Sequence, residues 1–225
     1  MRTISLFLSV FFAINITMAQ SFAEQQKKFP RVQQAYVAKW ETVKALIAAK
    51  VDDGKFELVL NAYKHEQILE IWIKGHMDNP HQLLKTYPFC ANSGTLGPKL
   101  QEGDLQIPEG NYFINVFNPM SSFHLSLGLN YPNRVDKVRS GSLPPGTDIY
   151  LHGGCATVGC ISITDNFIKE LYILAVEATN SGQRKIPVNI YPFRMTASNL
   201  TKFTRSYPMH QKFWSNLQRR YLAFK

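Results

Sequence analysis

The sequence has little cysteine: its 225 residues include three, Cys90, Cys155 and Cys160. An odd number excludes a complete set of internal disulfides, so at least one thiol has no partner within the chain. A Cys-X4-Cys pair with one histidine is not a zinc-binding spacing, and we expect no bound metal. The Gly153-Gly154 pair carries no phosphate-loop or dinucleotide-binding pattern, so we expect no cofactor.

Long apolar runs are also scarce, because the sequence has only one, at residues 4–18. Arg2 precedes this run, and the small residues Thr17 and Ala19 come just before Gln20. This pattern predicts a secretory signal peptide at residues 1–19, with an uncleaved N-terminal anchor as the alternative. We therefore expect an exported protein of the periplasm or cell envelope.

Charged residues make up only 18% of the chain, but basic ones dominate and the net charge is +9. Loss of residues 1–19 removes only Arg2 and leaves 24 basic minus 16 acidic residues, or +8. A basic surface outside the cytoplasm suits anionic polymers or the face of a membrane. Because the Lys and Arg residues are dispersed and no nucleic-acid motif appears, we expect no nucleic-acid partner.

Hydrophobic content of 45% is enough for one sizeable core, and apolar periodicity gives the expected elements. We expect an α+β fold with a small, mostly β core, a helix after the cysteine motif and helices at both termini. The division is a signal at 1–19, a helical segment at 20–54, a mostly β domain at 55–196 and a helical extension at 197–225. The predicted helices are 25–50, 166–179 and one or two in 197–225; the predicted strands are 56–63, 67–74, 83–89, 111–118, 122–129, 148–151 and 187–192; the predicted loops include 91–111 and 135–147.

The segment from Leu151 to Ser162 carries the clearest chemistry. His152 and Cys160 lie eight residues apart with three glycines between them, so a strand and a tight loop can bring imidazole and thiol together. A thiol attacks as the thiolate, which an adjacent base or a nearby helix N-terminus favours. Backbone N–H groups at Gly159 and Cys160, in the loop that includes Thr157, are candidates to stabilise an oxyanion. A buried cysteine beside a satisfied histidine is the alternative.

This segment resembles the signature of the L,D-transpeptidase (YkuD-type) catalytic domain, His-Gly, a spacer, then Ser/Thr-X-Gly-Cys, and is most similar to the short-spacer YafK-like branch. The similarity covers roughly residues 55–225. It also includes Ser93-Gly94, Gly97-Pro98-Lys99, Glu102-Gly103-Asp104, Gln106, Pro108-Glu109-Gly110, Asn118-Pro119, 121–127, Tyr131-Pro132-Asn133, 159–165, 186–196 and 213–224.

The resemblance implies a cysteine acyl-transfer enzyme that acts on diaminopimelate-containing peptidoglycan stem peptides. Cys160 would attack a stem carbonyl, and His152 would take the thiol proton and return it to the leaving amine. The backbone carbonyl of Gly153 would orient the imidazole. An amine would then resolve the thioester in cross-linking or protein attachment, or water would resolve it in trimming or in release of an attached protein.

The chain departs from the common family pattern at two positions near Cys160. Val158 replaces a second histidine, and Ser162 replaces an arginine. Substrate carboxylates would then bind elsewhere, and Lys99 and Arg194 are the candidates.

Several readings stay open. His124, with Ser122 on the expected strand 122–129, could position substrate or could be a core histidine. We expect Cys90 and Cys155 to be two small buried hydrophobic residues, with a disulfide as the alternative. Residues 197–225 could contact a membrane peripherally or cap the cleft. The alternative is that they form a solvated basic face. A non-catalytic peptidoglycan-binding protein and a thiol redox protein using Cys155 and Cys160 are the competing functions.

Overall fold

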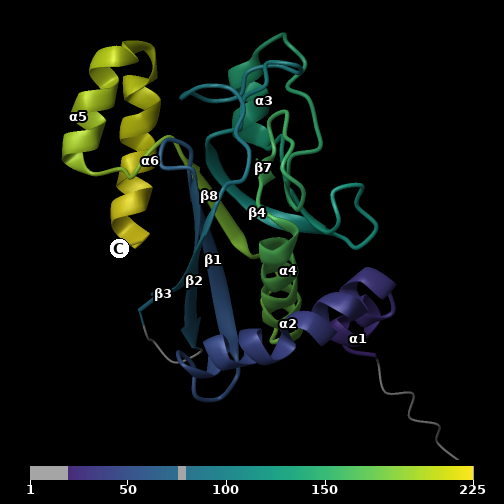
Figure 1. Ribbon diagram of the computed structural model, residues 1–225. Helices are drawn as coiled ribbons and strands as arrows, with labels where there is room; N and C mark the ends of the chain where they lie inside the picture. The colour runs from purple at the N-terminus through teal and green to yellow at the C-terminus, as the bar shows by residue number, and fades with distance from the viewer. Residues whose placement is uncertain (1–19, 76–79, 225) are drawn as a thin grey trace, which may run out of the picture.

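The computed structural model describes residues 20–75 and 80–224 (Figure 1). The signal peptide expected at residues 1–19 lies outside this part of the chain. Among the helices in the described ranges, none has both the length and the apolar character needed to cross a membrane.

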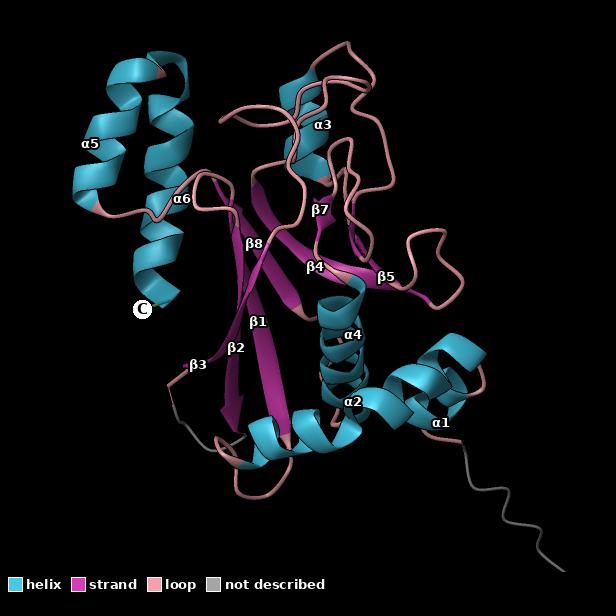
Figure 2. Ribbon diagram, viewed as in Figure 1, coloured by secondary structure: helices cyan, strands magenta, loops and turns pink. Residues whose placement is uncertain are grey.

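One curled sheet of eight strands organises the chain, in the order β3-β2-β1-β8-β4-β5-β6-β7 (Figure 2). The pairs β1–β8 and β6–β7 are parallel, and the other neighbours are antiparallel. The strands are β1 (Phe56–Tyr63), β2 (Ile68–Gly75), β3 (Gln82–Pro88), β4 (Gly110–Asn118), β5 (Ser126–Leu129), β6 (Tyr150–His152), β7 (Ile161–Ser162) and β8 (Pro187–Tyr191). The helices are α1 (Phe22–Lys27), α2 (Pro30–Ala48), α3 (Arg134–Ser140), α4 (Asp165–Asn180), α5 (Ala197–Ser206), the 3-10 turn η1 (Pro208–His210) and α6 (Gln211–Phe224). The predicted α+β class is confirmed.

Helix α4 follows the cysteine motif and is buried on most of its surface. It packs against α1 and α2 on one side and against β1, β5 and β6 on the other. Its buried carboxylate, Glu170, lies 3.2 Å from Lys39 Nζ and 2.5 Å from Lys85 Nζ, and it accepts a hydrogen bond from Tyr87. Two cations and a phenol thus compensate the desolvation of this charge. The helix is therefore a fixed support beside the strand that carries His152.

Two local predictions were wrong. Residues 135–147, expected as a loop, begin with α3 because Asn133 and Asp136 form a reciprocal capping box at its N-terminus. The Gly- and Pro-rich residues that follow α3 hid this signal. The expected strand 122–129 shortens to β5, because His124 adopts a left-handed φ of 69° in the turn before it.

Helices α5 and α6 cover the sheet at a different place from α1 and α2 (Figure 1). They bury a second hydrophobic cluster made by Tyr63, Tyr191, Phe193, Met195, Phe203, Trp214, Leu217 and Tyr221. Below this cluster, the fully buried Glu109 accepts hydrogen bonds from Lys64 Nζ at 3.1 Å, Gly97 N at 2.7 Å and Trp214 Nε1 at 2.8 Å. This carboxylate ties α6 to Lys64, the residue after β1, and to Gly97 in the loop that precedes β4.

We expect Glu109→Gln to lower the free energy of unfolding by about 3–5 kcal/mol, because it leaves the Lys64 ammonium, 2% exposed, without its counter-charge. Glu57→Gln is the matched control: the Glu57–Lys74 pair is 38% and 34% exposed, and its loss costs at most about 1 kcal/mol. Urea unfolding of both variants measures the difference. Equal effects would contradict the role given to Glu109.

Candidate active site

The parallel pairing of β6 with β7 brings His152 and Cys160 to one place. Leu151 pairs with Ile161 and His152 with Ser162, so Cys160 comes next to Tyr150. Because side chains alternate along strands, residues 150, 152 and 160 project to the same face. A pocket of about 290 Å³ opens there, lined by Asn118, Ser121, Ser122, Phe123, Ser126, Asp148, Tyr150, His152 and Cys160.

The imidazole of His152 is held on two sides. Its Nδ1 lies 2.6 Å from the Gly153 carbonyl oxygen, and the Phe123 ring lies 4.6 Å from its ring centre. A carbonyl only accepts, so this contact assigns the proton to Nδ1 and leaves Nε2 with a free lone pair. Burial lowers the pKa of His152, although the bond to Gly153 opposes that shift. The resting imidazole is therefore neutral and able to accept a proton.

The Cys160 thiol lies against backbone. Its Sγ accepts a hydrogen bond from Tyr150 N at 3.4 Å and donates to the Asp148 carbonyl at 3.5 Å. Burial raises the pKa of Cys160; the Tyr150 N–H and the more distant Lys99 charge oppose the shift, and Asp148 adds to it. The resting sulfur is thus a neutral thiol.

Two features differ from the expected arrangement. The strand β7 separates Cys160 from α4, so the helix N-terminus does not produce the expected thiolate. Within the described ranges, the thiol bonds to Tyr150 and Asp148 and not to the imidazole. Contacts of this kind often tighten only when substrate is bound.

The loop between His152 and Cys160 is tied at several points. Gly159 N donates to Ser93 Oγ at 2.8 Å, and Cys160 N donates to Thr157 Oγ1 at 2.9 Å. Both amides expected to stabilise an oxyanion are therefore already bonded, so that role requires them to change partners. It stays a prediction.

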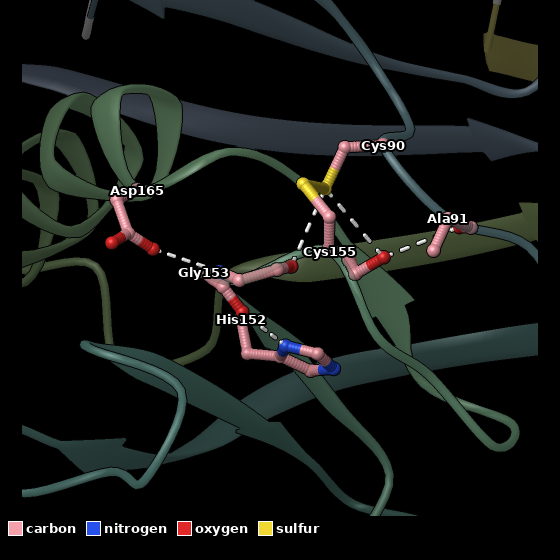
Figure 3. Close-up of a disulfide and its surroundings, with 8 residues drawn as sticks. Cys90, Ala91, His152, Gly153, Cys155 and Asp165 are labelled. Carbon is pink, nitrogen blue, oxygen red and sulfur yellow. Dashed lines mark hydrogen bonds between the residues drawn. A yellow bond between two sulfur atoms is a disulfide. The ribbon is translucent and has the colours of Figure 1, made fainter.

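A disulfide joins Cys90 to Cys155, 65 residues apart, beside the His152 strand (Figure 3). The expectation of two buried small hydrophobic residues was wrong, because Cys155 is exposed and bonded. Cys160 is the free cysteine. Since Cys155 is bonded to Cys90, the structure also removes the Cys155–Cys160 pair that a redox protein would use.

Of the four candidate substrate-binding residues, only Ser122 lines the pocket. His124 does not line it, and its buried Nε2 has no hydrogen-bond partner. Lys99 forms an ion pair with Asp104 at 2.6 Å, so binding of a substrate carboxylate would require that pair to open. That role stays a prediction.

Arg194 lies outside the pocket and pairs with Glu70 at 2.6 Å. The C-terminal helices contribute nothing to the pocket lining, so they do not cap the cleft as one reading expected.

Sequence reasoning missed several neighbours of the pair. Tyr150 and Asp148 contact the thiol, and Phe123 contacts the imidazole. Asp148 has a left-handed φ of 60°, and although aspartate is enriched in that conformation, one aspartate in a loop does not predict it.

Denatured protein should show one reactive thiol without reductant and three after reduction, because Cys90 and Cys155 are bonded to each other. Removing the bond with Cys90→Ser plus Cys155→Ser should lower the free energy of unfolding by about 4 kcal/mol, the loop-closure cost for a separation of this length. Three thiols without reductant would contradict the pairing.

Iodoacetamide alkylation of Cys160 at varied pH tests the neutral thiol. Burial raises its pKa, so the thiolate fraction is small below the ordinary thiol pKa of about 8.5, and the rate should still rise above that pH. A rate already at its plateau at neutral pH would indicate a thiolate–imidazolium pair instead.

Comparison with known proteins gives two sequence matches. The family model "L,D-transpeptidase catalytic domain" (YkuD) matches residues 59–190. The Escherichia coli (strain K12) protein named "Putative L,D-transpeptidase YafK" is 33% identical over 168 residues, covering 74% of this chain and 65% of that protein. The chain thus spans about two thirds of that relative's length.

Two solved structures are also similar. The helical cell shape determining protein Pgp2 of Campylobacter jejuni has a TM-score of 0.49 and 17% identity, covering 81% of this chain and 78% of that one. Bd1075 of Bdellovibrio bacteriovorus has a TM-score of 0.44 and 21% identity, covering 76% and 57%. The sequence matches carry the assignment: the chain belongs to the YkuD family of L,D-transpeptidase catalytic domains.

Proposed function

We propose that this protein is a cysteine acyl-transfer enzyme that acts on peptidoglycan stem peptides, with Cys160 as nucleophile and His152 as general base. The observation that carries the proposal is the shared pocket. It holds the free cysteine together with a histidine whose Nδ1 is engaged and whose Nε2 can accept a proton. Family membership supports the substrate class.

In the first half-reaction, Cys160 Sγ attacks the carbonyl carbon of a stem-peptide amide while its proton passes to His152 Nε2. The C–N bond of the tetrahedral intermediate then breaks, and the imidazolium gives its proton to the leaving amine. A thioester remains on Cys160. In the second half-reaction His152 takes a proton from the acceptor, an amine or water, and returns it to the thiol. The Gly153 carbonyl stabilises the imidazolium throughout.

The electrostatics favour proton transfer during attack over a preformed ion pair. Burial lowers the pKa of His152 and raises that of Cys160, so both groups rest uncharged. A charge pair then forms only as the sulfur bonds to carbon, where the developing charge can move onto the substrate oxygen. This behaviour limits unproductive oxidation of the thiol, because the thiolate is the reactive form.

The pocket surroundings suit a polar peptide. Hydroxyl and amide groups from Asn118, Ser121, Ser122 and Ser126 line it beside the reacting pair. The basic net charge of the chain is favourable toward an anionic polymer. The Cys90–Cys155 disulfide suits an oxidising compartment, which supports export to the cell envelope.

Incubation with purified muropeptides, followed by mass spectrometry of the products, tests the proposal. Cys160→Ala should lower turnover by roughly 1,000-fold or more, and His152→Ala by roughly 100-fold or more. His81→Ala, a histidine outside the pocket, is the matched control and should keep full activity.

Products joined to an added amine would identify transfer, and shortened stems or a released protein fragment would identify hydrolysis. Binding of muropeptides without any bond change, in wild type and Cys160→Ala alike, would instead favour a non-catalytic envelope protein.

A further inference from the structure

One peptide group, between Gly153 and Gly154, is bonded at both ends. Its carbonyl oxygen lies 2.6 Å from His152 Nδ1, and its N–H donates to Asp165 Oδ1 at 2.7 Å. Figure 3 shows Asp165 at the start of α4, with the turn between it and the imidazole. Carboxylate, peptide and imidazole therefore form a continuous hydrogen-bonded chain.

We propose that Asp165 is a positioning residue for His152, acting through this single peptide group. The inference rests on the proposed function, in which His152 is the base. A hydrogen bond at the N–H of a peptide polarises its carbonyl, which strengthens that carbonyl as an acceptor. Asp165 thus fixes the peptide plane that holds Nδ1–H and supports the imidazolium that forms during catalysis.

The absence of a side chain at Gly153 makes this approach possible. A Cβ there would lie 2.5 Å from Asp165 Oδ1 and 2.9 Å from Ile168 Cγ2. The carboxylate and α4 pack directly over the glycine, so no other group fits between Asp165 and the turn. The His-Gly-Gly sequence is therefore matched to a carboxylate at the first residue of the helix.

Charged groups around the turn come from α2, from α4 and from two loops. Arg31 of α2 donates to the carbonyls of Ser121 and His124, and Arg31, Lys169 and Asp165 all act electrostatically on His124. On the pocket side, Asp148 and Lys99 act on Cys160. Among these charged groups of the described residues, Asp165 alone bonds to the Gly153–Gly154 peptide. Because Asp165 is exposed, water screens its direct charge, and the bond itself carries the effect.

A purely structural role for Asp165 is the competing explanation, since a carboxylate in the first turn also stabilises a helix. Three variants separate the two roles. Asp165→Asn keeps an acceptor for Gly154 N but loses the charge, and Asp165→Ala loses both. The exchange Asp165→Asn plus Asn166→Asp restores a first-turn carboxylate one residue away from Gly154.

The measurements are the NMR titration of the His152 imidazole in substrate-free protein, thermal unfolding, and turnover of muropeptides. We expect the His152 pKa to fall by roughly half a unit in Asp165→Ala and less in Asp165→Asn, because the imidazolium loses support. The kcat should fall roughly tenfold and threefold, respectively, with KM unchanged. The exchange variant should recover the melting temperature of the wild type but neither the pKa nor kcat.

An unchanged His152 pKa in both single variants would overturn the inference, as would recovery of kcat in the exchange variant. The titration does not depend on the substrate. If wild-type protein turns over no muropeptide but the pKa still falls, the proposed function fails and the positioning contact stands. If muropeptides are turned over and the pKa does not move, only the role of Asp165 is refuted.

Discussion

The site depends on a short parallel pairing, in which two residues of β6 lie beside two of β7. That register sets Cys160 next to Tyr150 and places His152 on the same face, with β5 completing the other side of the strand. A slip of one residue would turn the thiol to the opposite face. Most other contacts of the loop act to keep this register: the disulfide to Cys90, the Ser93–Gly159 bond and the Asp165–Gly154 bond.

Burial also sets the charge of the two reacting side chains. Burying a base and an acid in one pocket without an ion pair makes both neutral forms more stable, which the pKa directions of His152 and Cys160 reflect. Backbone groups, not side-chain carboxylates, contact the two reacting side chains: Gly153 offers a carbonyl to the imidazole, and the thiol meets the carbonyl of Asp148 and the N–H of Tyr150. Orientation therefore comes from the fold of the loop, which explains why so many restraints converge there.

Local patterns predicted the elements with strong local signals. The hairpin of β1 and β2, the strand β8 and the helix α4 with Thr164 before it follow from periodicity and turn residues. The spacing of His152 and Cys160 indicated a catalytic pair, and the resemblance indicated the Gly153 contact. By contrast, α3 depended on a capping box within a Gly- and Pro-rich stretch.

Long-range partners carried no local signal. Cys90 and Cys155, Glu109 and Trp214, and Ser93 and Gly159 are each brought together by the folded sheet alone. The same holds for the thiol's own partners: sequence proximity suggested a helix dipole, whereas the strand pairing supplies the N–H of Tyr150. The ion pairs of Lys99 with Asp104 and of Arg194 with Glu70 occupy the two side chains that we expected to bind substrate carboxylates, so that role stays a prediction.

Trapping of the covalent intermediate tests most directly whether the shared pocket is a catalytic centre. The protein is mixed with a muropeptide, quenched in acid within the first turnover and digested for mass spectrometry. An acyl group on Cys160 in the wild type, formed much more slowly in His152→Ala, is the predicted result. An acyl group on another residue, or one that forms on Cys160 at the same rate without the imidazole, would contradict the pairing of these two side chains in catalysis.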